Sequence, residues 1–386
     1  MTRQWVAAEM VTGRLIASLP GVELDPGSPL RKTISTYDTA LGSLQLTPDP
    51  VDPMRAQPEN WERALEEGAS VLACFDDTDP LRSIQWSGWV SLQKRDGASD
   101  SVAFTLATLE SYLDCRFVGD VTYDTTWGRN AIIADLIANW ITAGGPTIQL
   151  ELDYSGAGPK PAESLVWQNT DNKSVLDRIT QLCAQLGGEF TIDCAWSADG
   201  LSLVHTLHFG DKIGTPAAAG KDPDVTFEQP GVITAFSQVR DYSKGKGANK
   251  VVPYSSGQGT TTPYGTPVLA SDFAGRPIFE FRYQPAPSIS PVALQQYAAQ
   301  AIKVLAPGAR SVALTVTTAR SQGRRLGSDW HLGDDVGYRI APTDASGRPV
   351  LVFPGGVSGV GRVIAYEVTD TTVTPILAES TVYVEA

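Results

Sequence analysis

The order of hydrophobic and polar residues predicts that the chain consists mainly of strands between about residues 30 and 110. We expect strands at 70–75 (SVLACF), 82–94 (RSIQWSGWVSLQK) and 101–109 (SVAFTLATL), separated by the turns DDTDP and RDGASD. Val102, Phe104 and Leu106 alternate with small or polar residues, as in a strand that buries one face. The pattern is typical of an antiparallel meander.

Between about residues 126 and 190 the apolar period becomes helical. One helix is expected in RNAIIADLIANWITAGG, ending at Gly144–Gly145, and a second in DNKSVLDRITQLCAQLGG, capped by Asp171 and ending at Gly187–Gly188. Each helix leads into a strand, TIQLELD after the first and EFTIDCAW after the second. These are helix–strand units of an α+β block.

The rest of the chain returns to strands. We expect a long loop at 243–267 that holds the strand KVVPY, and a helix at 290–306 with Ser290 as cap and Pro291 at its first position. Further strands are expected in the following segments: LSLVHTLHF, VITAFSQVR, RPIFEFRYQ, RSVALTVTT, VGYRIAP, RPVLVFP, GRVIAYEVTD and TTVTPILAE. The fold class is therefore α+β and β-rich.

Composition and charge narrow the class of function. At 386 residues the chain is long enough for roughly two or three domains, and its 36 Gly and 26 Pro favour many turns. The net charge of −13 argues against a protein that grips nucleic acid, because that requires many Lys and Arg against phosphates. No apolar stretch approaches the roughly 20 residues that span a bilayer. Four cysteines without a CxxC pair are expected to be buried thiols made in a reducing compartment: Cys74, Cys115, Cys183 and Cys194.

The three histidines are poor candidates for a metal or catalytic site. His205 and His208 lie three residues apart on an expected strand, so they face opposite sides and cannot share an ion. A site at His331 would need distant partners. In SDWHLGDDVGYRI, Gly333–Asp334 is expected to form a turn and a strand to begin at Asp335, so the carboxylates precede a strand and do not share a proton.

Other motifs also have a structural explanation. Glu151 and Asp153 share one strand face at a spacing that a glycosidase could use, but the alternation with leucines favours a wet face. The cluster at 75–80 (FDDTDP) lacks the pattern of a calcium loop, and 353–361 (FPGGVSGVG) and 245–250 (GKGANK) lack the spacing and the helix of phosphate-binding loops. We expect a solvated loop at a basic spot formed by Arg320, Arg324 and Arg325.

One ordered run resembles the second half of phage tail hub proteins, the baseplate hub or tail-tip minor tail proteins similar to the contractile-phage hub. The run comprises these segments: ANKVVPYSSG, GRPIFEFRY, SPVALQQYAAQAIKVL, SVALTVTT, LGDDV and GRVIAYEVTDTTVTPIL, with KSVLDRITQLCAQLGGEFTID upstream. The resemblance covers about residues 165–386, whereas the first 120 residues match only in their β-rich character.

The resemblance implies a homotrimer that closes the distal end of a tail tube in the virion, assembled in the host cytoplasm. It implies two tube-like antiparallel β-barrels per chain with the α+β block between them. The expected ranges are 1–125 (barrel-like), 126–230 (α+β), 231–315 (second tube-like region) and 316–386 (C-terminal β). The implied partners are the distal tail protein ring, the tape measure protein C-terminus, and tail fibre or other tail-tip proteins.

The same resemblance implies that DNA passes through the lumen, where an acidic surface would repel it. The chain ends at residue 386 without room for an appended lytic domain, so we expect no peptidoglycan cleavage. We expect no catalytic, cofactor or metal residues. Two alternatives stay open: a carbohydrate-active enzyme or sugar-binding module, suggested by nine Trp and by Glu151 and Asp153, and a neighbouring tail component, either distal tail or receptor-binding protein.

Overall fold

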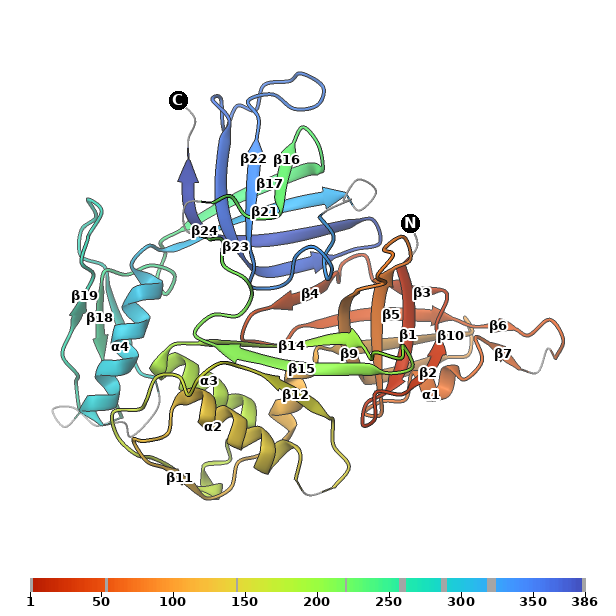
Figure 1. Cartoon of the computed structure of the whole chain (residues 1–386), viewed down its shortest axis with the longest axis horizontal. Helices are drawn as coiled ribbons and strands as arrows, with labels where there is room; N and C mark the ends of the chain where they lie inside the picture. The colour runs from red at the N-terminus through yellow and green to blue at the C-terminus, as the bar shows by residue number, and fades with distance from the viewer. Residues whose placement is uncertain are drawn as a thin grey trace.

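The computed structural model describes residues 3–52, 55–143, 145–218, 221–256, 262–285, 290–317 and 324–383, with side chains described up to 378. Two large sheets and a mixed α+β block make up most of it (Figure 1). None of the helices in these ranges combines the length and apolarity needed to cross a bilayer. The α+β, β-rich class predicted from the sequence is confirmed.

The N-terminal sheet is antiparallel throughout. Its strands, in spatial order, are β2 (Leu15–Ser18), β1 (Arg3–Glu9), β8 (Ser70–Asp76), β9 (Ile84–Asp96), β10 (Ser101–Ala107), β5 (Thr39–Gln45) and β3 (Val22–Leu24). Val102, Phe104 and Leu106 of β10 are buried, as their alternation predicts. A small hairpin of β6 (Thr47–Pro48) and β7 (Ala56–Gln57) and the short helix α1 (Trp61–Ala64) extend from one end of this sheet (Figure 1).

The C-terminal sheet includes one strand from the N-terminal part of the chain. Its order is β16 (Thr226–Gln229), β22 (Asp335–Ile340), β23 (Val357–Val368), β24 (Thr372–Tyr383), β21 (Ala309–Thr317) and β17 (Ile233–Asp241). The strand β4 (Leu30–Thr33) also pairs with β23, along the stretch Ala365–Val368. The chain therefore enters the second sheet before it has completed the first.

Closure of the two sheets into barrels is not observed. Within the described residues, no pairing joins the end strands of either sheet, so both are open. Three of the four end strands, β2, β3 and β16, have four, three and four residues, whereas β17 has nine. Such short strands offer few backbone groups for the hydrogen bonds that would close a sheet into a barrel. The division of the chain into domains at about residues 125, 230 and 315 stays a prediction.

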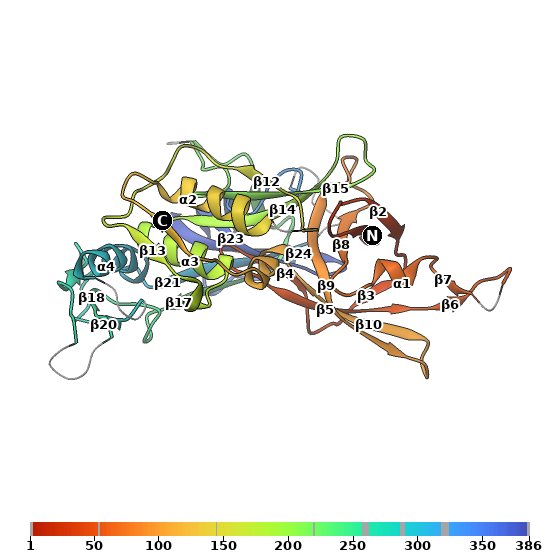
Figure 2. The ribbon, with the colours of Figure 1, turned by 90° about the horizontal axis from the view of Figure 1, so that it is seen from below.

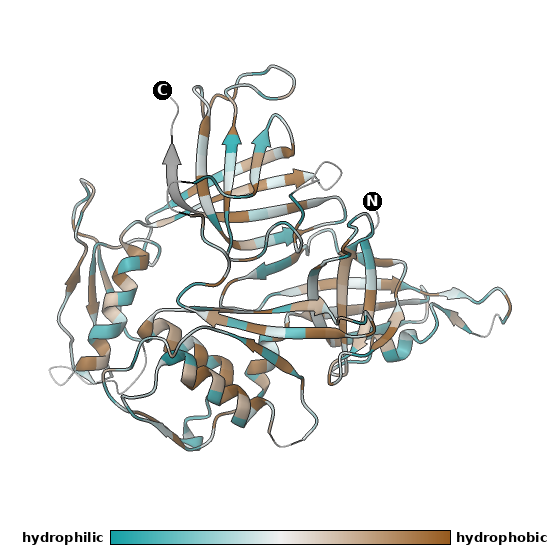
Figure 3. Cartoon of the chain, viewed as in Figure 1, coloured by the Kyte–Doolittle hydropathy of each residue, from teal (hydrophilic) through white to brown (hydrophobic). Residues whose placement is uncertain are grey.

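The α+β block lies between the sheets in the chain. It contains η1 (Leu109–Cys115), β11 (Val121–Tyr123), α2 (Arg129–Leu136), the π-helical turn η2 (Ile137–Ile141), β12 (Leu150–Asp153), β13 (Leu165–Trp167), η3 (Asn169–Asp171), α3 (Val175–Leu186), β14 (Glu189–Trp196) and β15 (Leu203–Gly210). The predicted apolar stripes of α2 and α3 form one core with β14 and β15. Figure 3 shows the brown hydrophobic positions along these helices.

A second helical unit packs beside this block. It consists of β18 (Lys250–Pro253), β19 (Val268–Leu269), β20 (Glu280–Tyr283) and α4 (Pro291–Leu305). The predicted cap is confirmed: Ser290 Oγ accepts a hydrogen bond from the N–H of Ala293 at 3.1 Å. The predicted strand KVVPY is found as β18, paired in parallel with β20.

Three local predictions are wrong. Asp171 does not cap α3, because η3 takes its carboxylate and Ser174 Oγ accepts from the N–H of Asp177 instead. The segment 348–354 (RPVLVFP) forms turns with Leu351 and Val352 exposed, since its two prolines cannot donate to a ladder. Cys115 is exposed rather than buried. Gly144 and residues 257–261 of the predicted loop lie outside the described residues.

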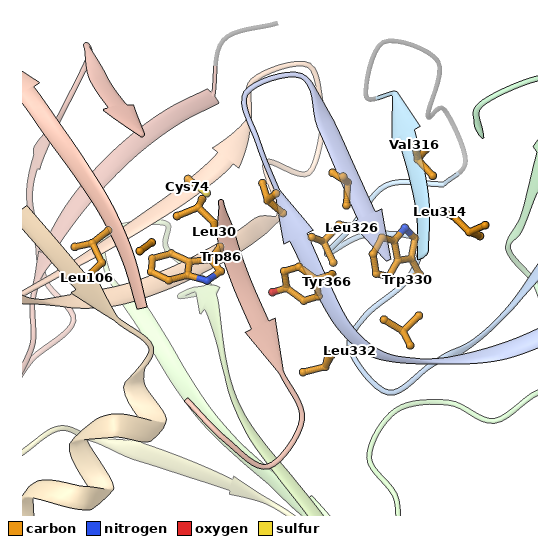
Figure 4. Packing of buried hydrophobic residues seen from close by; sticks show 14 of the residues in the cluster. Leu30, Cys74, Trp86, Leu106, Leu314, Val316, Leu326, Trp330, Leu332 and Tyr366 are labelled. Carbon is orange, nitrogen blue, oxygen red and sulfur yellow. The ribbon is translucent and has the colours of Figure 1, made fainter. Parts of the chain in front are cut away.

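A continuous hydrophobic core joins the two sheets. Trp86 of β9 and Tyr366 of β23 belong to one buried cluster, with Trp330 on the far side of Tyr366 at 6.1 Å between ring centroids (Figure 4). The Tyr366 hydroxyl donates to the carbonyl oxygen of Gln85 at 2.9 Å. Gln85 is the extra residue of a β-bulge, opposite no residue of β8, so the irregularity coincides with the contact between sheets.

We expect Tyr366→Phe to lower the free energy of unfolding by about 1–2 kcal/mol, because the buried carbonyl of Gln85 would lose its partner. Urea unfolding followed by tryptophan fluorescence measures the change. The control is Tyr37→Phe, which removes a hydroxyl from an exposed side chain and should have almost no effect. Equal stability of wild type and Tyr366→Phe would contradict the role of this bond.

Candidate functional site

The junction between the two sheets is built around the buried ammonium of Lys32. Because β4 is paired to β23, the side chain of Lys32 points to β14 and η1. Its Nζ lies 3.6 Å from Glu110 Oε1 and 3.3 Å from Asp193 Oδ1, and it donates to the carbonyl oxygen of Ile192. Figure 3 shows the polar, teal positions of β4. We call Lys32, Glu110 and Asp193 the Lys32 cluster.

The cluster is electrostatically compensated. Burial by itself lowers the pKa of Lys32, but the attraction of Glu110 and Asp193 outweighs burial and raises it. Glu110 is fully buried and its Oε1 also accepts from the N–H of Ile192 at 2.7 Å and from Thr191 Oγ1 at 3.1 Å. The charged form is therefore the stable form of Lys32 in the fold.

A cavity of about 750 Å³ opens beside the Lys32 cluster. Its walls come from β4, β9, β14, β15 and the segment 326–334, so all three parts of the chain contribute. We call it the junction cavity. Its polar and aromatic walls include the following residues: Lys32, Trp86, Asp153, Asp193, Cys194, Trp196, His208, His331, Asp334 and Tyr366.

Two of the three histidines meet in the junction cavity. His208 Nδ1 lies 2.8 Å from Asp153 Oδ2, and His208 Nε2 lies 3.5 Å from Asp193 Oδ2. His331 Nδ1 lies 3.6 Å from Asp334 Oδ2, and the interaction with this carboxylate is the main reason why the pKa of His331 is raised. Sequence reasoning treated these residues separately and missed their convergence. The parallel pairing of β12 with β15 sets Asp153 directly opposite His208, and the sequence carries no signal for that pairing.

The third histidine faces the other way, as predicted. His205 is buried on the opposite face of β15 from His208, and neither of its ring nitrogens has a hydrogen-bond partner among the described residues. Burial and the positive charge of Lys32 lower its pKa to about 4. His205 is therefore neutral at pH 7.

The cavity groups are arranged as an ion-pair network. Burial opposes ionisation of Asp334, but its hydrogen bonds with His331 and the N–H of Thr215 hold its pKa below the usual range. Burial raises the pKa of Cys194 to about 12, so the sulfur stays a thiol and not a thiolate nucleophile. Among the described residues, no three His, Cys, Asp or Glu side chains are placed to hold a metal ion. This arrangement cross-links segments that are distant in sequence.

The other predicted candidates are placed as follows. Glu151 and Asp153 are exposed on one face of β12 while Leu150 and Leu152 pack inward, as expected. The turn at 75–80 is confirmed, with Asp79 accepting from the N–H groups of Leu81 and Ser83. The turn before Asp335 and the strand that begins there are also confirmed.

The basic spot is not a solvated loop. Arg325 reaches Asp79 at 3.6 Å and Arg324 reaches Glu228 at 3.8 Å, and both side chains are mostly buried. Carboxylates of the same chain hold them, which the sequence pattern did not indicate. Arg320 lies outside the described residues.

Comparison with known proteins shows the fold. No family model and no curated protein matches the sequence. A tail protein from Neisseria meningitidis MC58 matches in structure with a TM-score of 0.54 at 13% identity, over 98% of this chain and 97% of that chain. The 43 kDa tail protein of prophage MuSo2 from Shewanella oneidensis matches with a TM-score of 0.52 at 12% identity, over 98% and 94%.

A third match is to a chain of a PdpA–VgrG complex, with a TM-score of 0.51 at 9% identity over 98% of this chain and 64% of that chain. The resemblance to phage tail proteins predicted from residues 165–386 is thus confirmed as a likeness of fold. It extends over nearly the whole chain, including the first 120 residues.

We expect Lys32→Met to lower the free energy of unfolding by about 3–5 kcal/mol, because Glu110 would remain as a buried charge without its partner. Chemical denaturation measures the loss. Adding Glu110→Gln to Lys32→Met should recover part of it, and Lys94→Met, at an exposed position, serves as the control. A Lys32→Met protein as stable as wild type would contradict the role of the cluster.

We also expect stability to fall between pH 7 and pH 5 because of His205. Its pKa is lowered from an ordinary value of 6.5 to about 4 in the fold, so the unfolded chain takes up a proton that the folded chain refuses. The contribution of neutral His205 to the free energy of unfolding is complete above pH 6.5 and is lost as the pH falls toward 4. Between pH 7 and pH 5 the loss is about 2 kcal/mol from the shift in pKa.

Unfolding of wild type and His205→Phe at both pH values tests this, since the variant should lose less stability on acidification. His331 has a raised pKa, so its contribution is present at low pH and is lost as pH rises. His331→Gln should therefore lose more stability than wild type on acidification. Identical pH dependence in wild type and His205→Phe would exclude the assignment.

Proposed function

We propose that this chain is a structural tail-tip protein that forms a trimeric hub at the distal end of a phage tail tube. The observation that carries the proposal is the match of fold to the tail protein from Neisseria meningitidis along almost the full length of both chains. The match to a second tail protein, of prophage MuSo2, supports it. In this role the protein is a virion component assembled in the host cytoplasm.

The architecture supports a hub in physical terms. Each chain has two large sheets, so three copies around an axis would present six sheets to a tube. The shared core and the Lys32 cluster bind the two sheets into one body, as a ring segment requires. In this proposal the ranges 1–125, 126–230, 231–315 and 316–386 are approximate divisions of the chain, and strands from all four pair in the C-terminal sheet.

The proposed partners follow from the position in the tail. The hub joins the distal tail protein ring and the C-terminus of the tape measure protein to tail fibres or other tail-tip proteins, and it gates the DNA path. The net charge of −13 suits a lumen through which DNA slides without binding. The proposed role needs no reaction chemistry, and the ion pairs of the junction cavity then serve to fix the fold.

Purified protein is expected to have the mass of three copies in analytical ultracentrifugation, and antibody labelling should mark the tail tip of intact virions. A mass of six copies would indicate a distal tail ring instead. A monomer at every concentration would contradict the hub.

A screen of the same sample on cell-wall polysaccharides separates the hub from the enzyme alternative. Glu151→Gln is the matched control, because Glu151 is exposed beside Asp153 on β12. An activity that is lost in this variant would overturn the proposal.

A further inference from the structure

Charge is distributed unevenly along the longest dimension of the molecule. Residues 240–310 contain eight Lys and Arg against three Asp and Glu, although the whole chain has a net charge of −13. Residues 46–67 contain six Asp and Glu against two Arg. The first range holds α4 and β18–β20, and the second holds the β6–β7 hairpin and α1. These elements lie at opposite ends of the molecule in both views (Figures 1 and 2).

The basic end combines exposed cations with exposed apolar surface. Lys244 and Lys246 are exposed on one turn. The Arg276 guanidinium lies 4.2 Å above the ring of Tyr242, whose other neighbour is the ring of Phe279 at 5.2 Å. Ile278, between Arg276 and Phe279 in the chain, is 64% exposed. Apolar side chains beside cations are typical of a surface that binds another protein.

The acidic residues within the basic end are already engaged. Glu280 lies 2.7 Å from Lys250 and 2.9 Å from Arg282. Asp241 and Asp272 each accept a backbone N–H two residues along the chain, at 2.8 Å. Lys244 and Lys246 are exposed, so their charges can face a partner outside the chain.

The acidic end has the complementary composition. Val51 is 93% exposed on the β6–β7 hairpin, where Asp49 accepts from the N–H of Val51 at 2.7 Å and so shapes the turn. Glu66 and Glu67 are exposed just after α1 and form no ion pair within the described residues. The acidic end therefore offers the exposed apolar side chain of Val51 and the exposed carboxylates of Glu66 and Glu67.

We infer that the two ends form the two halves of one head-to-tail contact between neighbouring copies of this chain. The inference rests on the proposed trimer and identifies its interface. A contact between two different faces generates a closed ring when its rotation closes, which a trimer requires. Val51 and the hairpin would meet Ile278 and Phe279, while Glu66 and Glu67 would face Lys244 and Lys246. If the basic end bound nucleic acid, the acidic end that carries Val51 would have no partner in the explanation. A contact between copies accounts for both ends.

Charge reversal tests the contact. One variant carries Lys244→Glu with Lys246→Glu, a second carries Glu66→Lys with Glu67→Lys, and a third carries all four changes. Each pairwise reversal should weaken self-association about tenfold or more, because like charges then face one another. The fourfold variant should regain most of the lost affinity, because opposite charges face one another again. Sedimentation over a concentration series, at low and high salt, measures the association constant.

The matched control is Lys160→Glu with Lys221→Glu, two exposed lysines outside both ends, which should associate like wild type. Rescue in the fourfold variant requires contact between two molecules, since the two ends are far apart within one (Figure 2). A wild-type trimer that is unaffected by either reversal would overturn the inference and leave the hub standing. A wild-type monomer would overturn both.

A gel-shift assay with duplex DNA tests the alternative that the basic end binds nucleic acid and not another copy of the chain. Binding that is lost with Lys244→Glu and Lys246→Glu and does not return in the fourfold variant would assign the basic end to nucleic acid and overturn the inference. Weak binding that is equal in all variants would agree with a contact between copies.

Discussion

The fold depends on one buried charge. Lys32 lies on a strand that leaves the N-terminal sheet, pairs with β23 of the C-terminal sheet and directs its ammonium against β14 and η1. A lysine without partners would be expelled from such a site or neutralised. Glu110 and Asp193 keep it charged, and these contacts join β4 to η1 and β14 of the α+β block. The core around Trp86, Tyr366 and Trp330 lies at the same junction between the two sheets.

The junction between the two sheets explains why carboxylates and histidines gather at the junction cavity. Asp153 and Asp193 flank His208, and Asp334 holds His331, so each carboxylate of the junction cavity faces a cationic or hydrogen-bonding partner. Under the proposed function, these contacts hold each copy together as one body. Its charged ends then matter more to the proposed function than its interior does.

Local patterns predicted local structure well. The alternation around Phe104 placed a strand, the stripe through Ile179 and Leu182 placed α3, and Ser290 followed by Pro291 placed the start of α4. The errors arose where distant or competing contacts intervene. Asp171 is taken by η3, and Arg324 and Arg325 are drawn to carboxylates on other segments. Leu351 and Val352 have strand-forming side chains, but the adjacent prolines prevent a ladder.

The sequence by itself determined most of the helices and strands, the opposite faces of His205 and His208, and the wet face of Glu151 and Asp153, because these depend on spacing along a few residues. It also determined the acidity of the chain. Only the tertiary structure decided that Lys32 lies against Ile192, 160 residues away, and that Asp153 lies opposite His208. Strand pairing between remote segments sets these contacts. The free energy that selects such a pairing comes from the whole core, and no short stretch of sequence contains it.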